Sequence, residues 1–383
     1  MPSENGSLFP SEFIALLNAT GKQFIERAGQ DLVRHATTQI LLGHNVRTQT
    51  EPLTRQRIAE VSGALLTMFE RGARTVPAFY DRLTALAIAA PAVSKSDVVL
   101  PPRVRHWLMG LTGKSVQNVL RSDKGSLDGF AESFDKAILA AADQLESMLG
   151  PLQMSLNVGG HQSRNAISQL SWREALRIMT TVGCAELAIR GSDKSRYGKL
   201  FERLVLGSVL TILGFTLDTS GKKKRKAFWL SDTSGDRECD ATLIVEPGRV
   251  ARFDIGFIGI GNPEIVRDKL SRFAREVERG ERNSSSTTIV IVDRYPTGPR
   301  ANSRQLAEQS GAVLVQMSMS FWPRELATAL LERFNYRHPL AGAADREAEQ
   351  LIRRGMKTVD VLSFLRDVDE GAELDDGLDD TVP

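Results

Sequence analysis

Two aspartates, Asp240 and Asp254, flank a segment with the pattern of a β-hairpin. Between them, two apolar runs are separated by Glu246-Pro-Gly-Arg249, which is typical of a tight turn. A hairpin brings facing residues within about 5 Å of each other across the ladder. Carboxylates at such a distance can share a hard divalent cation, and this is how many nucleases activate water against phosphodiesters. Each aspartate taken alone is equally compatible with capping a strand end or a turn.

A third acid, Glu202, lies on a predicted helix that precedes the hairpin, over residues 196–213, and ends at Gly214. The helical spacing places Glu202 on the same face as four aliphatic residues, Val205, Leu206, Val209 and Leu213. Burying an unpaired carboxylate costs several kcal/mol unless a cation, hydrogen bonds or protonation compensates. We therefore predict that Glu202 joins the metal site. The alternative is a salt bridge at the edge of the apolar stripe.

From residue 195 onward the predicted order of elements is α-β-β-β-α-β-α-β. The strands are predicted over residues 227–230, 241–245, 250–258, 287–292 and 312–317. The second helix opens at Asn262-Pro263, an N-cap followed by proline at the first helical position. This order favours an α/β fold, with a mixed sheet covered by helices on both faces.

The chain before residue 150 has helical periodicity, with predicted breaks at four proline-containing dipeptides, Glu51-Pro52, Ala90-Pro91, Pro101-Pro102 and Gly150-Pro151. The sequence thus predicts a helical N-terminal region over 1–155, a linker near 158–164 and a core over 170–335. C-terminal helices are predicted over 336–366, followed by a disordered acidic tail over 367–383.

The acids and the order of elements resemble the PD-(D/E)xK nuclease superfamily over about residues 195–318. The stretch Asp254-Ile-Gly-Phe-Ile-Gly-Ile-Gly-Asn-Pro-Glu-Ile-Val-Arg-Asp-Lys-Leu-Ser-Arg-Phe273 further resembles CfrBI-type type II restriction endonucleases. The resemblance implies a restriction-endonuclease-like mixed β-sheet core flanked by helices, with an N-terminal all-helical region. It also implies a magnesium-dependent enzyme that cleaves both strands of a short, specific DNA sequence. Asp240, Asp254 and Glu202 would then be the ligands of Mg²⁺.

The sequence departs from the superfamily at the position where a lysine is expected, two residues after Asp254, which is Gly256. Lys269 is the predicted substitute, because at about 100° per residue it projects about 40° from Phe273 on the apolar stripe of its helix. The alternative is a surface lysine that only snorkels. Glu264 points nearly opposite that stripe and is the weaker candidate.

The net charge of +2 conceals a basic body. The last 17 residues, 367–383, hold eight acids and no base, so the remainder carries 49 bases against 47 − 8 = 39 acids, a net of +10. A basic body suits a polyanion. The run Lys222-Lys-Lys-Arg-Lys226 can contact a DNA backbone, or it can be an exposed loop with no partner.

The expected partner is double-stranded DNA, and cutting a palindromic site favours a homodimer. A DNA methyltransferase acting on the same sites is a possible companion, since a host must protect its own DNA. Cys184 and Cys239 form no pattern and are expected to be reduced thiols in a cytoplasmic protein without a membrane span. Two rival functions stay open: an inactive DNA-binding module on a nuclease scaffold, which the missing lysine favours, and a repair nuclease that reads DNA structure.

Overall fold

A computed structural model describes residues 15–17, 19–88, 102–120, 126–156, 169–220, 222–223, 225–231, 239–256, 286–294, 307 and 311–366. Within them the chain forms two compact units, each with its own hydrophobic core. One unit includes Thr54–Asp193, and the other includes Thr20–Leu53 and the described chain from Lys194 onward. Throughout these residues no helix is both long and apolar enough to cross a membrane.

The first unit is helical, as the sequence predicts. Its helices are most of α4 (Val46–Thr75), α5 (Phe79–Ile88), α6 (Pro102–Leu108), α7 (Gly113–Leu120), α8 (Leu127–Leu149) and the first half of α9 (Trp172–Ile212). A short antiparallel pair, β1 (Met154–Ser155) and β2 (Gln169–Leu170), joins α8 to α9. Helix α8 ends at Gly150 with φ +81°, at the break predicted there.

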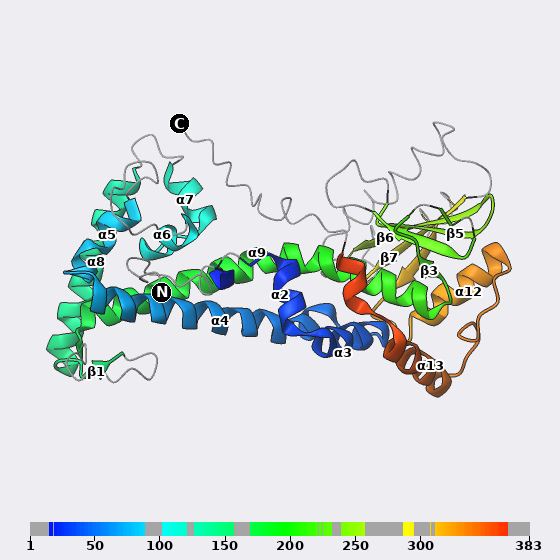
Figure 1. Cartoon of the computed structure of the whole chain (residues 1–383), viewed down its shortest axis with the longest axis horizontal. Coiled ribbons are helices and arrows are strands. Elements are labelled where there is room, and N and C mark those ends of the chain that lie inside the picture. Colours follow the sequence, from blue (N-terminus) through cyan, green and yellow to red (C-terminus); the bar gives the residue numbers. More distant parts are fainter. Residues whose placement is uncertain are drawn as a thin grey trace, which may run out of the picture. The chain divides into compact units, whose positions relative to one another are not determined.

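The second unit is built on a six-stranded mixed sheet in the order β3-β4-β5-β6-β7-β8 (Figure 1). The strands are β3 (Thr216–Leu217), β4 (Ala227–Leu230), β5 (Ala241–Glu246), β6 (Arg249–Gly256), β7 (Ser286–Val292) and β8 (Val313–Gln316). The pairs β4–β5 and β5–β6 are antiparallel, and the other pairs are parallel. The five predicted strands are confirmed, whereas the two-residue β3 is too short for a periodic signal. The predicted helices after Asn262 and over 303–309 fall almost entirely outside the described residues.

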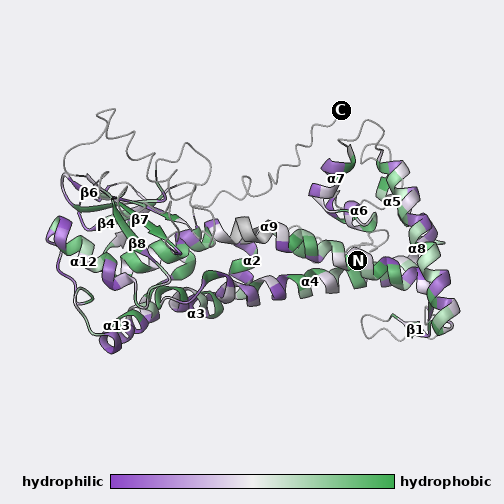
Figure 2. Ribbon diagram, turned by 180° about the vertical axis from the view of Figure 1, so that it is seen from behind, coloured by the Kyte–Doolittle hydropathy of each residue, from purple (hydrophilic) through white to green (hydrophobic). Residues whose placement is uncertain are grey.

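Helices from both ends of the chain complete the second unit. They are α2 (Gly21–Ala28), α3 (Gln30–Leu41), α12 (Pro323–Phe334), α13 (Asp345–Thr358) and the 3₁₀ helix η1 (Val361–Leu365). Their apolar residues join one hydrophobic cluster with alternate residues of the strands, such as Leu243 and Phe253, and with the second half of α9. Figure 2 shows hydrophobic residues concentrated along the strands. The fold is therefore mixed α/β with an additional helical region, as predicted.

The predicted break at Glu51-Pro52 is wrong, because α4 continues through Pro52 to Thr75. Proline removes one backbone hydrogen bond and is unfavourable inside a helix. Here burial of apolar residues on both sides of the proline, including Val46 before it and Leu53 after it, offsets that cost. Helices α4 and α9 each contribute to both units, so the units do not follow the linear boundaries near residues 155 and 170.

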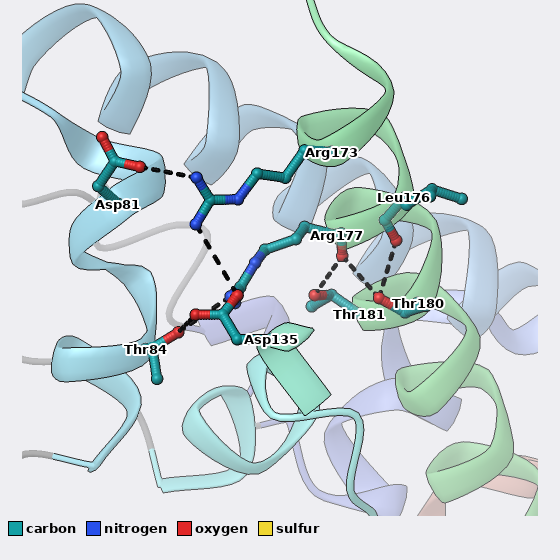
Figure 3. A network of polar contacts seen from close by, with 8 residues as sticks. All are labelled: Asp81, Thr84, Asp135, Arg173, Leu176, Arg177, Thr180 and Thr181. Atoms are coloured by element: carbon teal, nitrogen blue, oxygen red, sulfur yellow. Dashed lines mark hydrogen bonds and ion pairs between the residues drawn. The ribbon is translucent and has the colours of Figure 1, made fainter. Parts of the chain in front are cut away.

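A polar network around the buried Arg177 joins α5, α8 and α9 within the first unit (Figure 3). Arg177 of α9 is 3% exposed and forms an ion pair with Asp135 of α8. It also donates to Oγ1 of Thr84 at 2.9 Å, and Thr84 donates to Oδ2 of Asp135 at 2.9 Å. One turn earlier, Arg173 pairs with Asp81 at 2.9 Å. Burial lowers the pKa of Arg177, and the charge of Asp81 opposes that shift.

Candidate active site

The hairpin of β5 and β6 forms as the sequence predicts. Ala241 faces Phe253 and Leu243 faces Ala251, and the strands connect through Pro247 and Gly248. Gly248 has φ +77°, a conformation that glycine adopts without steric cost. A register shift between Ile244 and Glu246 adds a bulge beside the turn. These features fix the pairing of the two strands along their whole length.

Asp240 and Asp254 each lie one residue beyond the pair of Ala241 and Phe253, at the open end of the hairpin. The backbone N–H of Asp240 donates to the carbonyl of Phe253 at 2.8 Å, and the N–H of Ile255 donates to Oδ2 of Asp240 at 2.8 Å. Asp240 is thus held against the two residues that flank Asp254. Asp254 is 4% exposed, whereas Asp240 is half-buried. The hairpin therefore brings both backbones together at its open end.

Strand alternation sets Asp254 on the face of the sheet opposite the main cluster, to which Phe253 and Ile255 belong. The neighbouring row on the face of Asp254 contains Trp229, Thr242 and Arg252, paired in that order across β4, β5 and β6. Trp229 is 38% exposed. Neither Trp229 nor Arg252 was among the predicted site residues. Alternation from Asp254 would have found Arg252, whereas Trp229 depends on the pairing of β4 with β5.

Glu202 lies on α9, where the predicted apolar stripe is confirmed: Val205, Leu206, Val209 and Leu213 are all 0% exposed. Glu202 itself is half-buried, at the edge of that stripe. Apolar residues of its helix join the main hydrophobic cluster together with alternate residues of the strands. In the described part of the chain, no group of three or more His, Cys, Asp or Glu side chains is placed to hold a metal ion. The structure brings Asp240 and Asp254 together and leaves Glu202 on a separate element.

The residue after Glu202 ties α9 to the start of β5. Arg203, 7% exposed, donates from Nε to the carbonyl of Phe364 at 3.1 Å and from Nη1 to the carbonyl of Ser231. The backbone N–H of Ser231 in turn donates to the carbonyl of Asp240 at 3.0 Å. A continuous set of hydrogen bonds therefore connects the helix that carries Glu202 with the backbone of Asp240.

A further acid, Asp293, lies at the same edge of the sheet, directly after β7. Its backbone N–H donates to the carbonyl of Gly256 at 3.3 Å. Burial raises the pKa of its carboxyl group, and the positive charges of Arg294 and Arg47 oppose that shift. Sequence reasoning missed this acid, although it directly follows a predicted strand. A carboxyl with a raised pKa beside β6 is a candidate site residue.

The residue expected to assist the attacking water is not placed. Lys269 and Glu264 lie outside the described residues, between β6 and β7. Gly256 is the last residue of β6 and pairs with Val292.

Comparison with known proteins identifies the family of this chain. Residues 30–300 match the family model for the CfrBI restriction endonuclease. The chain is 31% identical to the type II restriction enzyme CfrBI of Citrobacter freundii over 382 residues, covering 98% of this chain and 99% of the relative. No solved structure gives a significant match. The family match covers the first unit's helices as well as the hairpin with Asp240 and Asp254. The chain belongs to the CfrBI restriction endonuclease family.

Proposed function

We propose that this protein is a magnesium-dependent, sequence-specific endonuclease of double-stranded DNA. The observation that carries the proposal is the adjacent placement of Asp240 and Asp254 at the open end of a hairpin, in a chain of a restriction endonuclease family. The relative with 31% identity over nearly the full length is named as a type II restriction enzyme. The mixed sheet and the order of its strands also support membership of the PD-(D/E)xK superfamily.

Asp240 and Asp254 would hold Mg²⁺, because hard divalent cations prefer carboxylate oxygens. The hydrogen bond from Ile255 N–H fixes the orientation of the Asp240 carboxylate, so this ligand is positioned before a metal binds. Bound there, the ion would lower the pKa of a water molecule and neutralise charge on the scissile phosphate. Glu202, on the neighbouring helix, is the proposed third ligand, either directly or through water. Lys269 would orient the attacking water.

Metal removal gives the first test. With supercoiled plasmid and Mg²⁺, we expect discrete linear fragments whose sequenced ends share one short motif. Addition of EDTA should stop cleavage, and an excess of Mg²⁺ should restore it. Supercoiled DNA that stays intact under every metal condition would favour the inactive binding module. Fragments without a common end sequence would favour a repair nuclease.

Lys269→Ala should lower the single-turnover cleavage rate by about 10²-fold while leaving duplex affinity within about twofold, because a positioned group that assists proton transfer contributes this much. Lys269→Arg should recover part of the rate. A neighbouring basic residue on the same segment, Arg267, provides the control, and Arg267→Ala should cleave at the wild-type rate. Equal rates for Lys269→Ala and wild type would assign the water-orienting role to another residue.

A homodimer is proposed because two-fold symmetry matches a palindromic site. A companion methyltransferase of the same specificity would protect the host DNA. Sedimentation of the full chain with and without a cognate duplex measures whether the protein is a dimer. Protection of plasmid DNA from cleavage after co-expression of the candidate methyltransferase tests whether that enzyme modifies the same sites.

A further inference from the structure

One buried acid holds Ser220 and Lys223, two described residues of the basic segment between β3 and β4. Asp218, 5% exposed, directly follows β3 and accepts hydrogen bonds from the backbone N–H groups of Ser220 (3.0 Å) and Lys223 (2.8 Å). The hydroxyl of Ser220 donates to the same carboxylate at 2.8 Å. The hydrogen bond from Lys223 is the main cause that holds the pKa of Asp218 below its ordinary value. The carboxylate therefore stays ionised and holds these two residues of the loop that carries the lysines.

This loop meets two other segments at the turn end of the sheet. The N–H of Lys226 donates to the carbonyl of Val245, on β5, at 3.3 Å. The ammonium of Lys226 lies 5.6 Å from the ring centroid of Tyr336, just after α12. These contacts bring a loop, a hairpin and a helix end together, although the three are far apart in the sequence.

Arg249, on the hairpin, contacts the end of α12. It begins β6, directly after the turn, and its guanidinium lies 5.7 Å from the ring centroid of Phe334. Its Nη2 donates to the carbonyl of Arg333, near the end of α12, at 3.4 Å. The distal cluster, as we name it, comprises six basic residues: Lys222, Lys223, Arg225, Lys226, Arg249 and Arg333.

All six residues of the distal cluster are exposed or half-exposed. Three acids lie among them. Asp218 is engaged by the loop, Glu246 lies 3.6 Å from Arg249, and Glu332 precedes Arg333 in α12. Six bases against three acids leave a net of +3 on this surface. The surface therefore carries a net positive charge, and the three acids are dispersed among the basic residues.

The distal cluster lies at the opposite end of β5 from Asp240. Val245, which contacts Lys226, is five residues from Asp240, or about 17 Å along a strand. This separation is several times the reach of a direct contact to the scissile phosphate. It is comparable to a few nucleotide steps along a duplex, at about 3.4 Å per step.

We propose that the distal cluster binds the phosphate backbone of the DNA duplex outside the position of cleavage, without reading its sequence. The inference rests on the proposed function in that DNA is the substrate. Lysine and arginine side chains that neutralise phosphates release counterions, so their contribution depends on salt and is the same for every sequence. The cluster adds affinity for flanking DNA, whereas the edge with Asp240 and Asp254 performs the hydrolysis.

The test is the triple variant Lys222→Ala/Lys223→Ala/Arg225→Ala, in which every replaced side chain is exposed. Binding to a duplex of about 30 base pairs without a cleavage site is measured by fluorescence anisotropy, in EDTA, across a series of NaCl concentrations. The slope of log K against log [NaCl] should become shallower by about 2 to 3, because each phosphate contact contributes about 0.9. The single-turnover cleavage rate at saturating cognate DNA and the cleavage position should stay unchanged.

A charge-matched control is Arg346→Ala/Arg354→Ala/Lys357→Ala, which removes three exposed bases from α13. Its slope should equal that of the wild type. An equal reduction in both variants would mean that net charge alone acts, and an unchanged slope in the loop variant would exclude the distal cluster; either result overturns the proposal. If the wild-type protein neither binds nor cleaves duplex DNA, the proposed function itself fails. The two failures are therefore distinguishable.

Discussion

Asp254→Asn is expected to reduce DNA cleavage at saturating Mg²⁺ by about 10³-fold or more, with little change in duplex affinity. Metal-based charge stabilisation supplies several kcal/mol to the transition state, and each loss of about 1.4 kcal/mol lowers the rate tenfold. Asparagine keeps the volume of a side chain that is only 4% exposed, so the packing should survive. Single-turnover cleavage of a cognate duplex measures the rate, and anisotropy in EDTA measures binding.

The matched control for this variant lies on the same hairpin. Glu246→Gln removes an acid at the turn end of β5, paired with Arg249 at 3.6 Å, and should cleave at close to the wild-type rate. Asp240→Asn keeps an oxygen that can accept from Ile255 N–H, so its loss of activity would come from the missing charge. Cleavage at the wild-type rate by Asp254→Asn would remove the two hairpin aspartates from the mechanism.

Asp135→Ala is expected to lower the free energy of unfolding of the first unit by about 3–5 kcal/mol, because it removes the carboxylate that is ion-paired with the buried Arg177 guanidinium. Arg177 is 3% exposed, so solvent cannot replace the lost carboxylate. Thr84 would also lose the acceptor that it contacts at 2.9 Å. Urea unfolding followed by circular dichroism measures the shift. Since the chain has two compact units, their transitions are fitted separately.

An exposed ion pair is the control for the buried one. Arg353 and Glu349 approach to 2.8 Å, but their side chains are 47% and 41% exposed. Glu349→Ala should therefore cost less than about 1 kcal/mol. The double variant Asp135→Leu/Arg177→Met should recover much of the stability, because an apolar pair removes the uncompensated charge. A cost below about 1 kcal/mol for Asp135→Ala would show that the network contributes little.

The sequence alone determined the hairpin and the relation of its two aspartates. Apolar alternation on β5 and β6 and the turn at Pro247-Gly248 are local patterns, so they fix the register. A register in which Ala241 faces Phe253 leaves Asp240 and Asp254 next to that pair, at the open end of the hairpin. The apolar stripe of α9 was also determined locally, since Val205 and Val209 are fully buried, as their spacing predicts.

Other features depend on contacts between distant parts of the chain. Pro52 predicts a helix break, yet burial on both sides carries α4 through it. The hydrogen bonds of Arg203 to Phe364 and Ser231 place the helix of Glu202 against distant segments, and helical periodicity does not contain this information. Asp293 reaches the end of β6 only because β6 and β7 pair in parallel.

The basic loop, too, has one property that is local to the sequence and one that depends on tertiary contacts. Its charge is evident in the sequence, but its joining with Arg249 and Arg333 depends on the tertiary structure. Local spacing determines which residues share a strand or a helix face, because backbone geometry repeats over a few residues. Which faces meet is decided by burial summed over the whole unit. The sequence therefore determined that the two aspartates lie together at the open end of the hairpin, and only the tertiary structure decided which other charged residues lie near them and which lie at the far end of the sheet.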